Sequence, residues 1–170
     1  MQFLPRFSAG VLGCLVATAV CANSIKVPVH QTSPNGQGDQ IGYVNFKDTQ
    51  FGMLIEPHLN SLTPGLHGFH IHQKPNCGDN GKAAGGHFDP NNTQKHLGPY
   101  NPNGHLGDLP VLYVNQKHKA QIPTLAPRLT VKAIQGHSLI IHKHGDNYSD
   151  KPKPLGGGGA RVACGLITQS

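Results

Sequence analysis

The stretch IGYVNFKDTQFGMLI, residues 41–55, carries the pattern that decides the fold. Apolar and polar side chains alternate over 41–46 and again over 51–55, where Phe51, Met53 and Ile55 would share one face. Because successive side chains of a strand point to opposite faces of a sheet, this alternation predicts two short strands, each with one buried face.

Other parts of the chain carry the same kind of signal, and turn residues such as SPNG at 33–36 and NPNG at 101–104 separate most of them. The further candidate strands are 25–29, 66–72, 109–114, 122–124, 129–133, 138–142 and 161–167. Short strands at regular spacing predict an all-β sandwich or barrel, and 22 Gly and 14 Pro suit many turns. The pattern predicts no helix, no internal repeat and no boundary between domains.

The first 22 residues are typical of a secretory signal peptide. Arg6 supplies the positive charge, residues 8–20 are apolar or small, and alanines offer cleavage positions. We expect cleavage after Ala22, with Ala19 as the alternative, which leaves one domain at 23–170. The apolar run is too short to be read as a spanning helix, so we expect no membrane contact after the signal is removed.

The charge balance is basic, with a net charge of +6, but the 14 Lys and Arg residues are scattered. No run of five or more basic residues occurs, and patches that interleave arginine with aromatic residues are missing. Nucleic-acid binding is therefore not expected. A modest positive field could instead attract a small anion.

Two long stretches, 73–108 and 144–159, interrupt the strand pattern. A long structureless loop in a compact domain needs something other than secondary structure to fix it. Removal of the signal leaves only Cys77 and Cys164, and two cysteines in an exported chain predict a disulfide rather than free thiols or a metal-bound pair. Metal ligands are the second candidate for fixing these loops.

Histidines are concentrated where metal ligands would be useful. On a strand, His70 and His72 project to the same face, while His67 points the other way and is expected to be a core histidine bonded to backbone. Three histidines and one aspartate in the first long loop form a plausible four-coordinate zinc site: His87, His96, His105 and Asp108. His142 would add a third imidazole to His70 and His72, a set that suits copper as well as zinc.

We expect the other histidines to lie outside any metal site. His30, His58, His118 and His137 stand beside polar or turn residues. His144 has the same parity as His142 and is the least certain exclusion.

Four separated motifs resemble those of the copper/zinc superoxide dismutase family. They are GLHGFHIH at 65–72, GGHFDP at 85–90, GHLGDL at 104–109 and GARVACG at 159–165. The resemblance covers most of the mature chain, and the motifs agree in order and spacing. The glycine run before Ala160 and the stretch DNYSD at 146–150 are similar to the bacterial, periplasmic branch.

The resemblance implies an eight-stranded antiparallel Greek-key barrel or sandwich with two long loops, one binding metal and one electrostatic. It also implies disproportionation of superoxide to dioxygen and hydrogen peroxide by a redox-cycling copper bridged to a structural zinc, in the periplasm. The implied copper ligands are His70, His72, His87 and His142. The implied zinc ligands are His87, His96, His105 and Asp108, so His87 would bridge the two metals.

Further roles follow from the same resemblance. Arg161 matches the active-site arginine, whose permanent charge can hold a small anion, and His87 would carry a proton during turnover. Asp146 matches a carboxylate that links a copper ligand to a zinc ligand, and the disulfide maps onto Cys77 and Cys164. The family also implies one copper and one zinc per subunit and a homodimer, with a monomer as the alternative. Three lysines on the loops are candidates for steering superoxide: Lys82, Lys151 and Lys153.

Two other functions remain open at the level of sequence. The same ligands could store or transfer copper without catalysis, although such a site has no need of an anion-holding arginine at position 161. A zinc hydrolase would suit three histidines around one open position, but no carboxylate is well placed as its general base.

Overall fold

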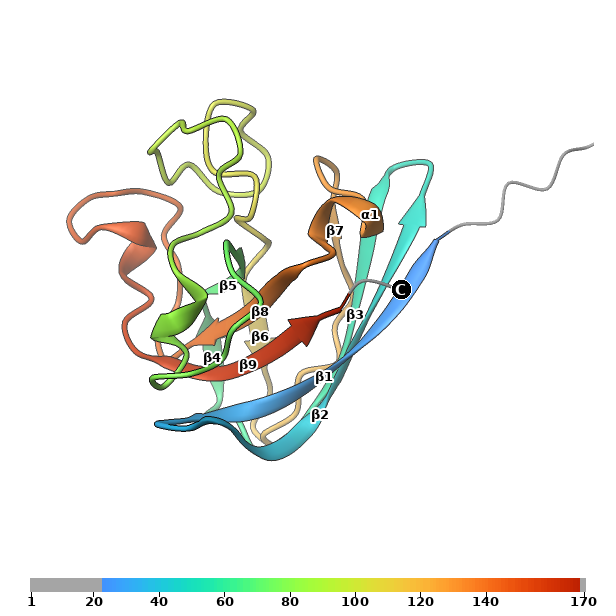
Figure 1. Cartoon of the computed structure of the whole chain (residues 1–170), viewed down its shortest axis with the longest axis vertical. Helices are drawn as coiled ribbons and strands as arrows, with labels where there is room; N and C mark the ends of the chain where they lie inside the picture. Colours follow the sequence, from blue (N-terminus) through green and yellow to red (C-terminus); the bar gives the residue numbers. More distant parts are fainter. Residues whose placement is uncertain (1–22, 169–170) are drawn as a thin grey trace, which may run out of the picture.

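The computed structural model describes residues 23–168, and most of its regular structure consists of antiparallel strands (Figure 1). The predicted signal peptide, residues 1–22, lies outside this range. The strands are β1 (Ser24–Ser33), β2 (Gly36–Thr49), β3 (Gly52–Leu59), β4 (Gly65–His67), β5 (Phe69–His72), β6 (Leu112–Val114), β7 (Thr124–Ala126), β8 (His137–His142) and β9 (Arg161–Ile167). Among residues 23–168, no helix combines the length and the apolar character needed to cross a membrane.

Seven strands form one curled sheet in the order β5-β8-β9-β1-β2-β3-β7, and β4 pairs with β6 in a small second sheet. The curl gives the main sheet the shape of a half-barrel (Figure 1). The last strand, β9, lies between β8 and β1, so strands far apart in sequence are neighbours, as in a Greek key. The predicted all-β antiparallel fold is confirmed.

The nine strands correspond to eight of the nine candidate strands, because the candidate at 66–72 is broken at Gly68. Residues 65–67 pair with β6, whereas residues 69–72 pair with β8, so the strand changes partner at this glycine. A Cβ on Gly68 would lie 3.1 Å from His70 Cε1 and 3.3 Å from His142 Cβ. Glycine at this position therefore leaves room for two of the candidate metal ligands.

The core follows the alternation seen in the sequence, with one correction. Val44, Phe46, Met53 and Ile55 are buried, and Phe46 is directly opposite Ile55 in the β2–β3 ladder. Phe51, however, is 67% exposed, because it lies in the turn before β3 rather than on the strand. The prediction that Phe51 shares a buried face with Met53 and Ile55 was wrong.

The candidate strand at 129–133 was also wrong, because a one-turn helix, α1 (Val131–Ile134), occupies this position. The Thr130 side chain accepts a hydrogen bond from the Ala133 backbone N–H, which is the geometry of a helix N-cap. Val131 and Ile134 are both buried, three residues apart. The apolar residues of this stretch therefore follow helical spacing, and the cap residue was the overlooked signal.

The two long stretches form loops with little regular structure, as predicted. The first contains the 3₁₀ turn η1 (Lys82–Ala84), and the second contains η2 (Leu155–Gly157). The loops contact each other, since the backbone N–H of His96 donates to Asp150 Oδ2 over 3.0 Å (Figure 1). A disulfide joins Cys77 in the first loop to Cys164 on β9, with Cα atoms 5.9 Å apart.

Candidate metal centre

The strand-borne histidines lie on the face of β5 and β8 that points away from the core. Ile71 is fully buried in the core, so His70 and His72 on either side of it project together from the opposite face. On β8, Ile141 likewise packs in the core, and His142 follows it at a register shift in the β8–β9 ladder. This places the His142 ring 4.9 Å from the His70 ring, centroid to centroid.

The loop-borne residues are fixed to the same strand by backbone hydrogen bonds. The Phe88 N–H donates to the Ile71 carbonyl over 2.8 Å, and the Ile71 N–H donates to the Gly107 carbonyl over 2.9 Å. Isolated bridges pair His72 with His87 and His70 with Asp108. Both ends of the histidine-rich loop therefore meet at β5, which brings His87 and Asp108 to the strand histidines.

Asp108 lies at the centre of the loop-borne group. Its Oδ1 is 2.9 Å from His87 Nδ1 and 3.5 Å from His105 Nδ1, and its Oδ2 is 3.0 Å from His96 Nδ1. The side chains of His87, His96 and Asp108 are almost fully buried, while that of His105 is 10% exposed. One carboxylate thus faces three imidazoles in a space that excludes most water.

The ring nitrogens that face the centre make no well-aligned hydrogen bond, although His96 Nδ1 and His105 Nδ1 lie 3.0 and 3.5 Å from Asp108. They are His70 Nδ1, His72 Nε2, His87 Nε2, His96 Nδ1, His105 Nδ1 and His142 Nε2. A buried polar atom without a partner is costly, and six in one cluster call for a ligand that the protein alone does not supply. Neutral imidazole nitrogens with a free lone pair are metal ligands.

Hydrogen bonds on the far side of four rings explain which nitrogen is left free. His72 Nδ1 donates to the Gly85 carbonyl over 3.0 Å, and His142 Nδ1 donates to the Gly159 carbonyl over 3.1 Å. His70 Nε2 and His96 Nε2 each lie 2.7 Å from a carboxylate oxygen of Asp146. In a neutral ring, the nitrogen that bonds to such an acceptor carries the proton, so the other nitrogen presents its lone pair toward the centre.

The potential ligand atoms form two overlapping groups, each with all its atoms within 4.8 Å of one another. The first contains His70, His72, His87 and His142, the same residues as the predicted copper set. The second contains His70, His87, His96 and Asp108, so it shares three members with the predicted zinc set and has His70 in place of His105.

The positions of the rings explain why the second group contains His70 rather than His105. The His70 ring stacks on the His87 ring with centroids 3.9 Å apart, whereas the His105 ring is 5.3 Å from His87 and 6.0 Å from His96. His105 nevertheless points its unpaired Nδ1 toward Asp108. It belongs to the cluster as a peripheral member.

The two halves of the cluster differ in charge. Burial, followed by the repulsion of nearby His87, lowers the pKa of His70 and of His72 well below its usual range. Burial also lowers the pKa of His142 to about 4. The strand-borne imidazoles are therefore neutral at neutral pH, which is the form that binds a metal.

Carboxylates dominate the other half. Burial alone would raise the pKa of Asp108 and of Asp146, but hydrogen bonds with the surrounding histidines outweigh it and lower both. Burial likewise opposes a charge on His96, yet the carboxylates of Asp108 and Asp146 beside its two ring nitrogens raise its pKa to about 9. Two ionised carboxylates around imidazoles make an anionic environment that suits a divalent cation such as zinc.

Arg161 begins β9 and reaches the loop that carries His87. Its Nη1 and Nη2 donate to the carbonyls of Gly81 and Gly85, each over 2.6 Å. The Gly85 carbonyl also accepts from His72, so one backbone oxygen connects the guanidinium to the strand-borne group. Burial lowers the pKa of Arg161, but a guanidinium remains charged at any physiological pH.

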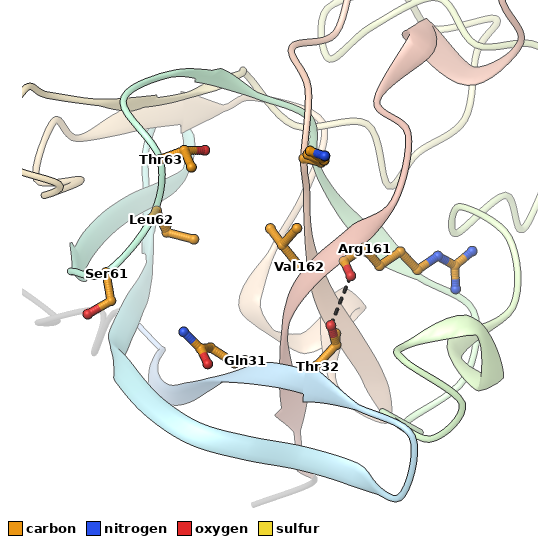
Figure 2. Close-up of a pocket in the computed structure, with 8 residues that line it drawn as sticks. Gln31, Thr32, Ser61, Leu62, Thr63, Arg161 and Val162 are labelled. Carbon is orange, nitrogen blue, oxygen red and sulfur yellow. Dashed lines mark hydrogen bonds between the residues drawn. The ribbon is translucent and has the colours of Figure 1, made fainter.

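A cavity of about 400 Å³ lies on the opposite side of the Arg161 backbone (Figure 2). Residues of β1, of the β3–β4 connection and of β9 line it, including Thr32, Thr63 and Val162. The guanidinium of Arg161 points away from this cavity, toward residues 81–85 (Figure 2). The unpaired donor atoms of the histidine cluster, rather than this cavity, therefore mark the functional site.

Of the histidines predicted to lie outside the metal site, His58, His118 and His144 are exposed, and His30 and His137 are half-buried. His67 is buried, and its two nitrogens bond to the carbonyls of His142 and Thr63, so it is a core histidine. His144 is exposed and outside both groups. The sequence reasoning missed Asp150 and Tyr148, which contact His96 and Asp146 through backbone groups. Their only signal was a place in the stretch DNYSD.

The fold and the cluster together define a class of protein: an antiparallel β-barrel with adjacent imidazole-rich and carboxylate-containing metal-binding groups. The donor atoms fit copper in the first group and zinc in the second. The family model described as copper/zinc superoxide dismutase matches residues 40–167. The chain therefore belongs to the copper/zinc superoxide dismutase family.

Named relatives agree with this assignment. Superoxide dismutase [Cu-Zn] 1 of Salmonella typhimurium is 52% identical over 92% of this chain and 94% of its own length. The solved copper/zinc superoxide dismutase of Brucella abortus superposes with a TM-score of 0.81 at 45% identity, over 85% of this chain and 99% of that one. The solution structure of the monomeric Salmonella enterica enzyme gives 0.76 at 48% identity, over 86% and 100%. The protein is thus a copper- and zinc-dependent oxidoreductase that disproportionates superoxide.

Proposed function

We propose that the cluster holds the copper and zinc sites of the dismutase, with His87 as the ligand shared between them. The copper ligands would be His70, His72, His87 and His142, and the zinc ligands His87, His96, His105 and Asp108. The observation that carries this assignment is the set of six buried ring nitrogens without partners, all within these two sets. His105 is included on the strength of its unpaired nitrogen, although its ring lies at the edge of the cluster.

When bound, copper would supply the one-electron redox chemistry that disproportionation of superoxide needs, and zinc would supply a fixed positive charge. Arg161 attracts and orients the anion, since its charge is permanent and two carbonyls fix its guanidinium. When it is not bound to a metal, His87 Nε2, which has no hydrogen-bond partner, would take a proton from solvent and donate it to the peroxide product, whose second proton would come from solvent. Arg161 and His87 are therefore the proposed catalytic residues.

Asp146 and the disulfide would keep these groups in register. Asp146 accepts hydrogen bonds from one ligand of each set, His70 and His96, and so fixes the orientation of both rings. The Cys77–Cys164 disulfide joins the loop that Arg161 contacts to β9, the strand that carries Arg161. Its neighbours Ala84 and Ile140 are fully buried and form a small apolar cluster with the two cysteines.

We further propose that residues 1–22 direct export, that the mature protein is residues 23–170, and that it protects the periplasm from superoxide. The disulfide and the bacterial relatives support this location. The proposed assembly is a homodimer, with the monomer as the alternative, and the Salmonella enterica relative is titled as monomeric. Light scattering of the mature protein distinguishes the two.

The test of the proposed site is superoxide decay catalysed by residues 23–170 loaded with one copper and one zinc. We expect His142→Ala to lower the rate by more than about 100-fold, since it removes a proposed ligand. His144→Ala is the matched control, because His144 is exposed two residues away and should leave the rate unchanged. If His142→Ala keeps full activity and full copper content, the copper assignment is wrong.

A further inference from the structure

Tyr148 lies in the second long loop and makes three contacts, one with Asp146 and two with residues that flank Asp108 in the sequence. Its backbone N–H donates to Asp146 Oδ1 over 2.7 Å. Its ring lies against the backbone of Gly98, and its hydroxyl oxygen accepts from the Val111 N–H over 2.9 Å. One residue therefore connects the loop of Asp146 to the segment that carries Asp108.

The contact with Gly98 leads directly to Asp108. A Cβ at Gly98 would lie 2.8 Å from Tyr148 Cγ, so the ring uses the space that a side chain would need. The Gly98 N–H donates to Asp108 Oδ2 over 3.3 Å. The ring thus packs against Gly98, whose N–H bonds to Asp108, while the backbone N–H of Tyr148 bonds to Asp146.

The conformation of Tyr148 is itself unusual. Its φ is +56°, in the left-handed region that a bulky residue other than glycine rarely adopts. Such a conformation persists only where the surroundings determine it, and it tends to occur at functional sites. Here the contacts of the hydroxyl and the ring keep Tyr148 in this conformation, and its backbone N–H points toward Asp146 as a result.

We propose that Tyr148 is a positioning residue for the zinc site, which sets the orientation of Asp146 and Asp108 and thereby slows the release of zinc. The inference rests on the zinc ligands proposed above. Tyr148 acts through the two carboxylates and contacts no proposed ligand ring by hydrogen bond. The copper side should respond less, because only His70 bonds to Asp146, whereas His72 and His142 are held by the carbonyls of Gly85 and Gly159.

Two variants separate the contacts. Tyr148→Phe removes only the hydroxyl that accepts from Val111. Tyr148→Asn removes the ring as well, while asparagine still tolerates a positive φ. Tyr113→Phe is the matched control, since Tyr113 lies on β6 with 44% of its surface exposed.

The experiment measures zinc release from the copper- and zinc-loaded protein to a chromogenic chelator, together with the visible spectrum of Co²⁺ placed in the zinc site. We expect Tyr148→Phe to release zinc about tenfold faster and to shift the cobalt bands, and Tyr148→Asn to do both more strongly. Copper release should change less, and Tyr113→Phe should match the wild type. A purely structural role would alter thermal stability without altering the cobalt bands.

Unchanged zinc release and cobalt bands in both Tyr148 variants would overturn the inference. Asp108→Asn, measured in parallel, tells this failure apart from a failure of the proposed site. If Asp108→Asn disturbs the cobalt bands and the Tyr148 variants do not, only the role of Tyr148 is wrong. If Asp108→Asn also leaves them unchanged, the zinc assignment is wrong and the inference falls with it.

Discussion

The two halves of the metal cluster are built by different means. His70, His72 and His142 lie on strands, where ladder hydrogen bonds and a packed core beneath them fix the backbone. His96 and His105 lie on a loop without regular structure, where side-chain contacts with Asp108 and backbone bonds to Asp150, Lys95 and Arg128 fix them instead. The strand half of the cluster is therefore formed by the fold, whereas the loop half is formed by polar contacts.

This difference also separates the electrostatics. In the strand half, burial lowers the pKa of the histidines and leaves neutral rings. In the loop half, ionised carboxylates raise the pKa of His96 to about 9, so positive charge is favoured there. Positive charge is what a divalent metal brings, and we therefore expect the loop half to depend on metal far more than the strand half does.

A cavity in the core should be the change that destabilises the strand half most. Ile71→Ala removes a fully buried side chain between His70 and His72, and we expect a loss of about 2–5 kcal/mol in the free energy of unfolding. Urea unfolding of the metal-free protein measures it. Ile122→Ala is the control, since Ile122 is 55% exposed and should change stability by less than about 0.5 kcal/mol. Equal effects of the two variants would contradict the comparison.

The loop half should be broken by a change that leaves the core intact. Asp108→Asn keeps the shape of the side chain but removes the charge that faces His87, His96 and His105. We expect zinc affinity to fall by about 10- to 100-fold or more, while the unfolding of the metal-free strands changes little. Competition with a chelator measures the affinity, and exposed Asp39→Asn serves as the control. Wild-type affinity in Asp108→Asn would place zinc elsewhere.

The smallest effect concerns charges that surround the cluster without belonging to it. Lys82, Lys151 and Lys153 are exposed on the two loops, and changing all three to glutamine should lower the rate of superoxide decay a few-fold at low ionic strength. The loss should disappear in high salt, because salt screens charges on the surface. The same change at three exposed lysines outside these loops, Lys47, Lys117 and Lys132, should have less effect. A rate and salt dependence like those of the wild type would exclude steering by these lysines.

The sequence predicts the strand half of the molecule well because strand periodicity places side chains directly. The spacing of two between His70 and His72 was enough to put both rings on one face. Short periodic stretches gave wrong strand predictions, since 129–133 contains a capped helical turn and Phe51 lies in a turn. Local propensity cannot settle such short stretches when tertiary packing decides between strand and helix.

The loop half could not be derived from periodicity. His96 and His105 were singled out by residue type and assigned by the family resemblance, because their positions depend on contacts across the loop rather than on local pattern. The contact of Gly85 with both His72 and Arg161 left no trace in the sequence, since it is made by a backbone oxygen. The same holds for the amides that bind Asp146 and Asp150.

Amide hydrogen exchange of the metal-free and zinc-loaded protein, with the disulfide intact, tests the central difference most directly. We predict that removing zinc speeds exchange in the loop 73–108 while the ladder amides of β5, β8 and β9 keep their protection. The strands are held by packing and by each other, whereas the loop would lose the charge that its carboxylates face. Equal protection of loop and strands in the metal-free protein would contradict the account, because the loop would then be formed by the fold alone.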